Sequence, residues 1–246
     1  IKKKNTLGNK DEIITTRFDQ VITPNILNKG SWDKFIIDFV NTRTKYTNKE
    51  FNIIDIGSNI GLITRQLLNT NKSILRSYCV EPNINNFKIM KQNLIKFKNK
   101  AFLYNFALTN DFKKKKKLFL DNKNFGNYSL LKKKGETDTV KTLNANIFLT
   151  KIIKKNKIKN LIYKSDTQGF DEIILLNLNY ELFNIIDILI IEISNFDFLK
   201  KNELKFFKIL KNYKYKFDEY KNSLSNKEIL KKISLEKEFN LLLSKF

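Results

Sequence analysis

Short runs of apolar, mostly β-branched or aromatic residues alternate along the chain with stretches in which apolar residues recur every three or four positions. The short runs predict buried strands, and the stretches with helical spacing predict amphipathic helices that cover them. We expect seven strands, over residues 51–56, 73–81, 101–108, 160–166, 185–193, 213–220 and 238–245. This alternation predicts an α/β protein with a mostly parallel sheet and helices on both faces.

Apolar residues at helical spacing place the connecting helices. They recur at Ile60, Ile63 and Leu67, at Phe87, Met90, Leu94 and Phe97, over 171–178, and at Leu204, Phe207 and Leu210. Ser225 and Glu228 have the spacing of a capping box before a further helix. The strand over 185–193 is the most apolar, which predicts a central position in the sheet.

The pattern divides the chain at residue 50. Residues 1–50 are predicted to form an N-terminal helical preamble, with one amphipathic helix at 31–40, and residues 51–246 the main domain. This length fits one domain of ordinary size with a small appendage. Residues 109–150 are polar and rich in lysine, with two short strand-like pieces.

The residue types present limit the chemistry. Histidine is absent, so the commonest general base and the commonest metal ligand are both missing. The one cysteine, Cys79, excludes an internal disulfide and favours a reducing, cytoplasmic location. The longest strongly apolar run, Ile185–Ile193, contains Asp187 and has about half the length of a membrane span, so we expect no span.

A formal net charge of +22 has two interpretations. One is a polyanionic partner, such as nucleic acid or an anionic surface. The other is a genome rich in A and T, which would also give the many Lys, Asn and Ile residues. We favour the second, because lysine far outnumbers arginine, the residue suited to bidentate phosphate binding. The runs Lys113–Lys117 and Lys132–Lys134 are predicted to be solvated loops or strand edges, and they are the best places to look for an anionic ligand.

A strand that runs into "DIGSNIG", residues 55–61, and then into a helix predicts a cofactor-binding turn. Gly57 would let the backbone turn sharply, and Gly61 would let the helix start approach its neighbours without a Cβ. The dinucleotide motif G-x-G-x-x-G and the P-loop lysine are both absent. The spacing therefore favours S-adenosylmethionine (SAM), whose amino-acid tail would meet turn amides and Asp55 or Asn59.

Glu81 ends the second strand, twenty residues after Gly61. An acidic residue at this strand end is placed to accept hydrogen bonds from two ribose hydroxyls. The turn, the acidic strand end and the strand order together favour a nucleoside-binding site over a tight turn followed by an ordinary glutamate.

Six segments in this order resemble the FkbM-type SAM-dependent methyltransferases. They are "IIDIGSNIG" (53–61), "CVEPNINNFKIMKQNL" (79–94), "NFALTN" (105–110), "VKTLNANIFL" (140–149), "LIYKSDTQGFDEIIL" (161–175) and "LIIEIS" (189–194). The resemblance covers about residues 20–245. It implies a Rossmann-like class I methyltransferase fold with a seven-stranded sheet, residues 51–246 as the methyltransferase domain, SAM as methyl donor, and O-methylation of a sugar or other small-molecule hydroxyl.

The resemblance also implies roles for individual residues. Asp55, Gly57, Asn59 and Gly61 would line the methionine end of SAM, Glu81 would bind the ribose, Pro82 and Asn83 would shape the adenosine pocket, Ala107 would lie near the adenine, and Asp166 would face both the methionine end and the acceptor. The chain departs from the family pattern at two positions. Gln168 stands where the family usually has Glu in K-x-D-x-E-G, and Asn144 stands where it usually has Asp in the "TLD" piece.

A hydroxyl acceptor must lose its proton during methyl transfer, and without histidine the candidate bases are carboxylates and lysine. Asp166 is the first candidate, because open α/β sheets bind ligands at strand ends. Glu192 is the second, and Lys164 the third, since burial can lower the pKa of a lysine. Nothing in the spacing requires a metal, although Asp166, Glu192 and a nearby Asp have the oxygen ligands that Mg²⁺ prefers.

Three functions follow from these observations. The leading one is SAM-dependent O-methylation of a saccharide or other small molecule. The second keeps the donor and methylates a ribose 2′-hydroxyl of RNA, with Phe125 or Tyr128 stacking on bases beside Lys132–Lys134. The third is a nucleic-acid-binding module without catalytic activity. The oligomeric state is not encoded in any pattern that we recognise.

Overall fold

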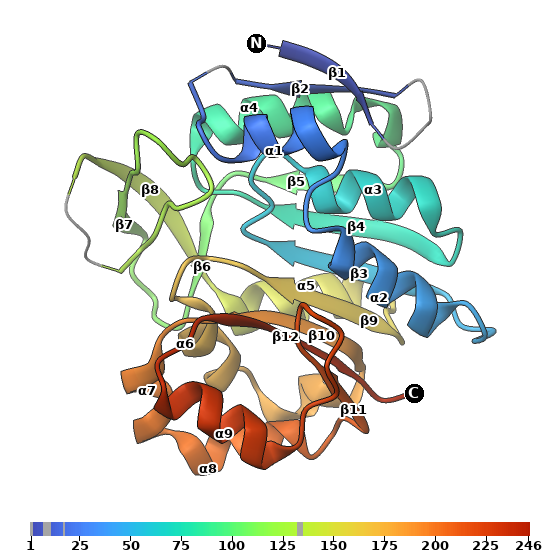
Figure 1. Cartoon of the computed structure of the whole chain (residues 1–246), viewed down its shortest axis with the longest axis vertical. Helices are drawn as coiled ribbons and strands as arrows, with labels where there is room; N and C mark the ends of the chain where they lie inside the picture. Colours follow the sequence, from blue (N-terminus) through green and yellow to red (C-terminus); the bar gives the residue numbers. More distant parts are fainter. Residues whose placement is uncertain (1, 7–10, 17, 132–134) are drawn as a thin grey trace.

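A seven-stranded, mostly parallel sheet forms the centre of the molecule in the computed structural model, which describes residues 2–6, 11–16, 18–131 and 135–246 (Figure 1). Its strands, in spatial order, are β11 (Tyr215–Phe217), β12 (Phe239–Ser244), β10 (Ile186–Ile193), β9 (Leu161–Ser165), β3 (Phe51–Ile56), β4 (Ile74–Val80) and β5 (Ala101–Tyr104). Only β12 runs antiparallel to its neighbours, β10 and β11. The expected sheet is confirmed, although its middle strand is β9, and β10 lies next to it.

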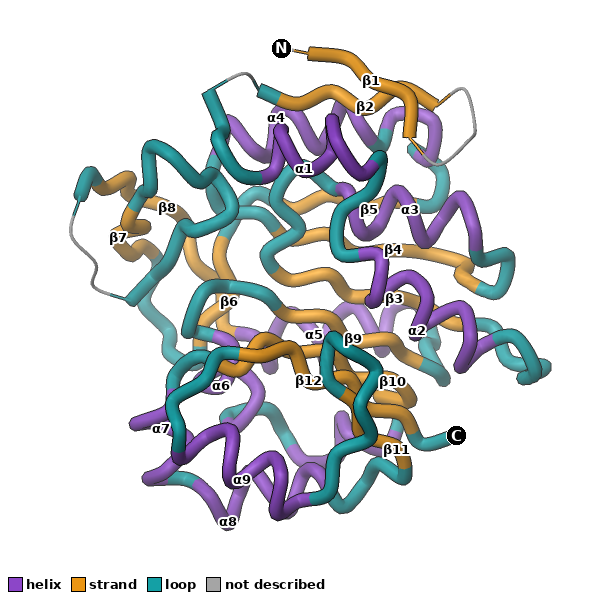
Figure 2. The backbone as a smooth tube through the Cα atoms, viewed as in Figure 1, coloured by secondary structure: helices purple, strands orange, loops and turns teal. Residues whose placement is uncertain are grey.

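Helices cover both faces of this sheet, as the alternating pattern predicted (Figure 2). On one face pack α2 (Lys34–Thr44), α3 (Leu62–Thr70) and α4 (Ile84–Asn93), followed by the short helix η1 (Ile95–Phe97). On the other face pack α5 (Ala145–Asn156), α6 (Asp171–Leu176), η2 (Tyr180–Asn184), α7 (Phe196–Lys201), α8 (Glu203–Leu210) and α9 (Asn226–Ser234).

Successive strand residues point to opposite faces, and this divides the buried apolar residues into two cores. Ile53 and Ile190 belong to the core under α2, α3 and α4, whereas their neighbours Ile54 and Ile191 belong to the core under α5 and α6. Because both faces are covered, β3, β9 and β10 are buried along their whole length and lack an alternation of buried and exposed residues.

The strand predicted over 101–108 is wrong as a single element. β5 ends at Tyr104, and the chain leaves the sheet at Asn105, whose side-chain amide donates hydrogen bonds to the backbone oxygens of Glu81 and Pro82. The next residues form β6 (Ala107–Thr109), which pairs with β8 (Thr137–Asn144), and β8 pairs in turn with β7 (Lys115–Phe119). The resulting three-stranded sheet lies beside the carboxyl ends of β3 and β4 (Figure 1).

The lysine runs lie in and around this small sheet. Residues 115–117 form part of β7, as the strand-edge interpretation expected, and Lys116 forms an ion pair with Asp111 at 2.7 Å. The run Lys132–Lys134 lies outside the described residues.

The first 50 residues contain more than the one helix that was expected. A hairpin of β1 (Lys2–Thr6) and β2 (Asp11–Thr15) comes first, followed by α1 (Ile22–Lys29) and then α2. The helix expected at 31–40 begins at Lys34 and continues to Thr44. Its residues Ile36 and Val40 are buried in the same core as Phe51 of β3.

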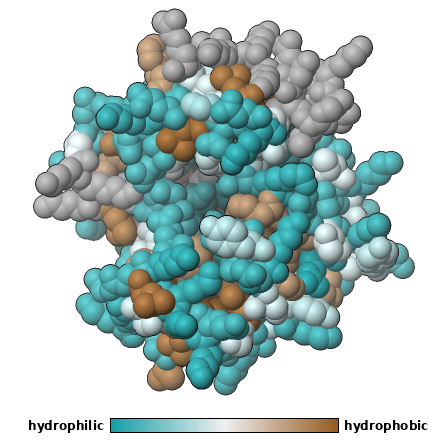
Figure 3. Space-filling model, viewed as in Figure 1, coloured by the Kyte–Doolittle hydropathy of each residue, from teal (hydrophilic) through white to brown (hydrophobic). Residues whose placement is uncertain are grey.

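Two details of the C-terminal part test the helical spacing. The capping box of Ser225 and Glu228 is confirmed at the start of α9. The helix over Leu204–Leu210 is confirmed, and its predicted face is correct at Phe207 and Leu210, which pack in the core. The prediction is wrong at Leu204, which is 90% exposed, and it missed Phe206, which is fully buried. Within the described part of the chain, no helix has both the length and the apolar character needed to cross a bilayer. The surface in Figure 3 is mostly hydrophilic.

Candidate active site

The turn after β3 requires glycine at residue 57. Its φ is +72°, and a Cβ there would lie 1.8 Å from the backbone oxygen of Asp166, on the neighbouring strand end. The amides of Gly57 and Ser58 both donate to the carbonyl of Val80 at 3.0 Å. The turn is therefore pressed between the ends of β4 and β9, and its peptide groups lie at the carboxyl edge of the sheet.

Gly61 has a different role. It precedes α3 with φ +81°, and a Cβ there would meet Met90 Cγ at 2.9 Å and Leu94 Cδ1 at 3.1 Å. The glycine thus permits α3 to pack closely on α4. Gly61 is not among the residues that line the cavity described below.

Glu81 follows β4 directly and is 4% exposed. Its two carboxylate oxygens accept hydrogen bonds from the backbone N–H groups of Asn59, at 2.9 Å, and Asn83, at 2.8 Å. Burial raises the pKa of Glu81 to about 7, although both of these hydrogen bonds act to lower it. Asn83 caps α4, because its side-chain oxygen accepts from the amides of Asn85 and Asn86.

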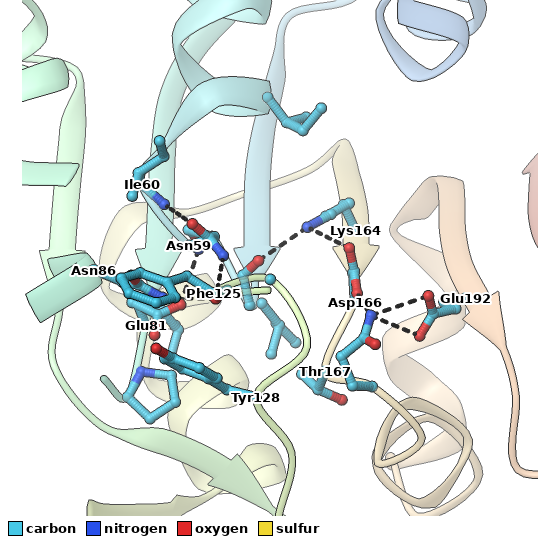
Figure 4. Close-up of a pocket in the computed structure, with 18 of the residues that line it drawn as sticks. Asn59, Ile60, Glu81, Asn86, Phe125, Tyr128, Lys164, Asp166, Thr167 and Glu192 are labelled. Atoms are coloured by element: carbon cyan, nitrogen blue, oxygen red, sulfur yellow. Dashed lines mark hydrogen bonds and ion pairs between the residues drawn. The ribbon is translucent and has the colours of Figure 1, made fainter. Parts of the chain in front are cut away.

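A cavity of about 230 Å³ opens where the carboxyl ends of β3, β4, β9 and β10 meet. The predicted site residues that line it are Gly57, Asn59, Glu81, Pro82, Ala107, Lys164, Asp166 and Glu192. Those that do not line it are Asp55, Gly61 and Asn83. Figure 4 shows Glu81, Asn86, Phe125 and Tyr128 at one end of this cavity, and Lys164, Asp166 and Glu192 at the other.

An aromatic pair forms the wall beside Glu81. The rings of Phe125 and Tyr128 are 5.8 Å apart between centroids. Side-chain amides of Asn59 and Asn86 both donate to the backbone oxygen of Phe125, at 2.9 and 3.1 Å (Figure 4). The buried carboxylate of Asp19, which also accepts from an amide of α1, accepts from the backbone N–H of Phe125 at 2.8 Å. The wall is therefore attached to three separate parts of the chain.

Lys164 lies at the other end and is 4% exposed. Its ammonium lies 3.1 Å from Asp55 Oδ1 and 3.9 Å from Asp166 Oδ2, and it donates to the carbonyl of Gly57 at 3.1 Å. Burial acts to lower the pKa of Lys164, but the charges of Asp55 and Asp166 outweigh it and raise this pKa above its usual value. The expectation of a lowered pKa is therefore wrong, and a lysine that stays protonated cannot act as a general base.

Gln168 connects the two carboxyl groups that were candidate bases. Its side-chain amide nitrogen donates to Asp166 Oδ1 at 2.9 Å and lies 3.1 and 3.2 Å from the two oxygens of Glu192. Burial, and then the charge of Asp166, raise the pKa of Glu192 well above its usual value. The raised pKa favours the protonated form of Glu192 near neutral pH, so Asp166 stays the first candidate base.

The structure adds residues that the sequence patterns did not identify. Asp33 and Asn240 line the cavity, one just before α2 and one on β12. Phe125 and Tyr128, expected to stack on RNA, line the cavity as well. Asn144, noted as a departure from the family pattern, caps α5 and is not a lining residue. Of these positions, only that of Asn240 had a signal in the sequence. Once β10 and β12 are known to pair, their register places Asn240 opposite Glu192.

Among the described residues, no group of three or more histidine, cysteine, aspartate or glutamate side chains is arranged to hold a metal ion.

The chain was compared with known proteins. No family model matches it, and no curated protein matches it. Among solved structures, it is similar to the methyltransferase FkbM from Methylobacillus flagellatus KT, with 12% identity, a TM-score of 0.51, and coverage of 89% of this chain and 50% of that chain. This chain therefore spans half of that protein.

Two further structures match with lower TM-scores. A precorrin-6y C5,15-methyltransferase from Geobacter metallireducens GS-15 has 11% identity, a TM-score of 0.42, and coverage of 94% of this chain and 93% of that chain. TrmK from M. capricolum, solved with S-adenosyl-homocysteine, has 16% identity, a TM-score of 0.38, and coverage of 84% and 67%. From its strand order and the similarity to FkbM, the chain has a Rossmann-like methyltransferase fold.

Proposed function

We propose that this protein is an S-adenosylmethionine-dependent methyltransferase whose donor binds in the cavity at the carboxyl edge of the sheet. The observation that carries the proposal is the presence of Gly57, Asn59 and the carboxylate of Glu81 around one cavity. Gly57 lets the turn lie against the end of β9 at the cavity wall, and Glu81 is placed to accept hydrogen bonds from ribose hydroxyls. The rings of Phe125 and Tyr128, with Pro82, offer apolar surface for an adenine.

The acceptor in this proposal is a hydroxyl of a sugar or another small polar molecule. The far end of the cavity is lined by Trp32, Asp33, Gln168, Glu192 and Asn240. These side chains combine an aromatic surface with several hydrogen-bonding groups, a combination suited to a polyol. Lys164 is the one lysine among the described lining residues, and it is already paired with carboxylates, so this end does not favour a phosphate.

The chemistry required of the protein is mainly positioning. When bound, the donor supplies a methyl group that is already activated on a sulfonium sulfur. The chain's own residues then have to hold the acceptor hydroxyl in line and take its proton. Asp166 is placed for the second task, because it lies at the end of β9, lines the cavity and is held by Gln168 and Lys164.

RNA remains a second candidate acceptor because of the outer face of the small sheet. Lys115 and Lys117 on β7 and Lys141 on β8 are exposed, and Lys115 lies directly opposite Lys141. Like charges at paired positions destabilise a sheet unless an anion neutralises them. If these lysines bind RNA, added salt should strongly weaken methylation of an RNA acceptor.

The test is a methyl-transfer assay with the purified protein. SAM labelled in its methyl group is incubated with a panel of mono- and oligosaccharides and, separately, with unstructured RNA, and labelled product and S-adenosylhomocysteine are measured. We expect labelled saccharide. Labelled RNA would favour the second acceptor. RNA binding without any binding of SAM by calorimetry would leave only a non-catalytic nucleic-acid-binding module.

Glu81→Gln tests the donor site without an acceptor. The amide nitrogen of glutamine would face a backbone N–H, and the ribose would lose a charged acceptor, so SAM affinity should fall about a hundredfold. Calorimetry at a pH above the raised pKa of Glu81 measures this loss. The exposed Glu50→Gln is the matched control and should bind SAM normally. Equal affinities in wild type and Glu81→Gln would remove the ribose role.

A further inference from the structure

The loop that follows β9 has an uncommon backbone conformation at a residue that lines the cavity. Gln168 has φ +57°, in the left-handed region that residues with a Cβ rarely adopt, and Gly169 follows with φ +95°. Side chains from two other segments fix this conformation. The buried Ser129 hydroxyl donates to the backbone oxygen of Gln168 at 2.6 Å, and the Asn195 amide donates to that of Gly169 at 3.0 Å. Strain that the surroundings fix in this way often serves to place a side chain at a functional site.

The side-chain amide of Gln168 joins two carboxyl groups. Its nitrogen has two N–H groups, and it donates to Asp166 Oδ1 at 2.9 Å while lying 3.1 and 3.2 Å from the two oxygens of Glu192. The Glu192 residue is 8% exposed, whereas the Asp166 side chain is 31% exposed. The amide therefore connects a carboxyl group that a ligand can reach to one that is buried.

The two oxygens of Asp166 have different surroundings. Oδ1 accepts the hydrogen bond from Gln168. The Lys164 ammonium lies 3.9 Å from Oδ2, which is too far for a hydrogen bond, and no described residue donates a hydrogen bond to this oxygen. Asp166 lines the cavity, so Oδ2 is the oxygen whose lone pairs are left for a ligand.

We propose that Gln168 is a positioning residue for methyl transfer, whose amide nitrogen fixes Asp166 Oδ1 beside Glu192 and so leaves Asp166 Oδ2 to take the proton of the acceptor hydroxyl. The inference rests on the proposed function. In the step, the acceptor O–H bond breaks and its proton passes to Asp166 Oδ2, while the acceptor oxygen forms the new bond to the methyl carbon. The electron pair of the breaking C–S bond stays on sulfur, which becomes the neutral thioether of S-adenosylhomocysteine.

The test measures kcat and KM for the acceptor that carries the most label in the panel assay, and SAM affinity by calorimetry. Gln168→Met keeps about the same side-chain length and removes both N–H donors. We expect kcat to fall about tenfold, because Asp166 loses a hydrogen bond to its charged form, while KM and SAM affinity change less than about twofold. Gln92→Met, at an exposed position on α4, is the matched control and should change none of these quantities.

A second variant separates activity from stability. Gln168→Asn is one methylene shorter, so its amide cannot reach both carboxyl groups, but asparagine tolerates a φ of +57° better than glutamine does. We therefore expect kcat to fall as in Gln168→Met, while the midpoint of urea unfolding stays at or above the wild-type value. A variant that lost activity by unfolding would have a lower midpoint.

A double-mutant cycle shows whether Gln168 acts through Asp166. Asp166→Asn alone should lower kcat about a hundredfold or more. Adding Gln168→Met to it should cost nothing further, because the group that Gln168 positions is already gone. A further tenfold loss in that background, or wild-type kcat in both single variants of Gln168, would overturn the inference and leave the proposed function standing. A wild-type protein that labels neither saccharide nor RNA would overturn both.

Discussion

Replacing Gly57 by alanine is expected to abolish donor binding and to lower the free energy of unfolding by about 4 kcal/mol or more. The new Cβ would lie 1.8 Å from the backbone oxygen of Asp166, and the φ of +72° would be strained as well. A backbone oxygen cannot move aside as a side chain can, so the turn or the end of β9 has to shift. Urea unfolding and calorimetry with SAM measure the two effects.

Gly30→Ala is the matched control for this substitution. Gly30 has almost the same backbone conformation, with φ +70°, but nothing lies within 4 Å of a Cβ added there. Its replacement should cost about 1 kcal/mol, the usual penalty of the left-handed region, and leave SAM binding intact. The difference between the two variants isolates the steric contact. Similar losses at both positions would show that the contact with Asp166 is unimportant.

Replacing Lys164 by methionine is expected to lower the free energy of unfolding by about 3 to 5 kcal/mol. Asp55 is fully buried, and Lys164 is its cation at 3.1 Å, so the substitution leaves an uncompensated charge in the core. SAM binding should weaken too, because the Gly57 carbonyl loses the group that holds it. Denaturant unfolding at neutral pH gives the loss directly.

Lys200→Met provides the comparison. Lys200 pairs with Glu236 at 2.6 Å, but both side chains are substantially exposed, and such pairs contribute about 1 kcal/mol or less. A small loss of unfolding free energy in Lys200→Met, together with a large loss in Lys164→Met, would show that burial accounts for the difference. If Lys164→Met unfolded at the wild-type denaturant concentration, the assignment of Lys164 as the cation for buried Asp55 would fail.

The sheet could be predicted from the sequence because its signals are local. β3 and β10 are short, strongly apolar runs, and the turn at Gly57 contains two of the chain's 7 glycines. The acidic end of β4 is likewise visible, since Glu81 follows an apolar run directly. Strand ends and tight turns are determined by a few neighbouring residues, so single-chain patterns reveal them.

Part of the proposed acceptor end could not be predicted because it is assembled from distant segments. Asp33 precedes a helix in the N-terminal region, and Asn240 belongs to the antiparallel β12. No short pattern shows that these residues share a cavity with Glu192. The break between β5 and β6 was missed for a related reason, because it depends on Asn105 binding the backbone of Glu81 and Pro82.

Hydrogen bonds connect the aromatic wall to the N-terminal region of the chain. The Asp19 carboxylate binds an amide of α1 through one oxygen and the amide of Phe125 through the other, while Asn59 and Asn86 hold the carbonyl of the same Phe125. Swinging the wall outward breaks contacts to all of these segments at once. We therefore expect the aromatic wall and the first helix to open as one unit, because hydrogen bonds at Asp19 join them.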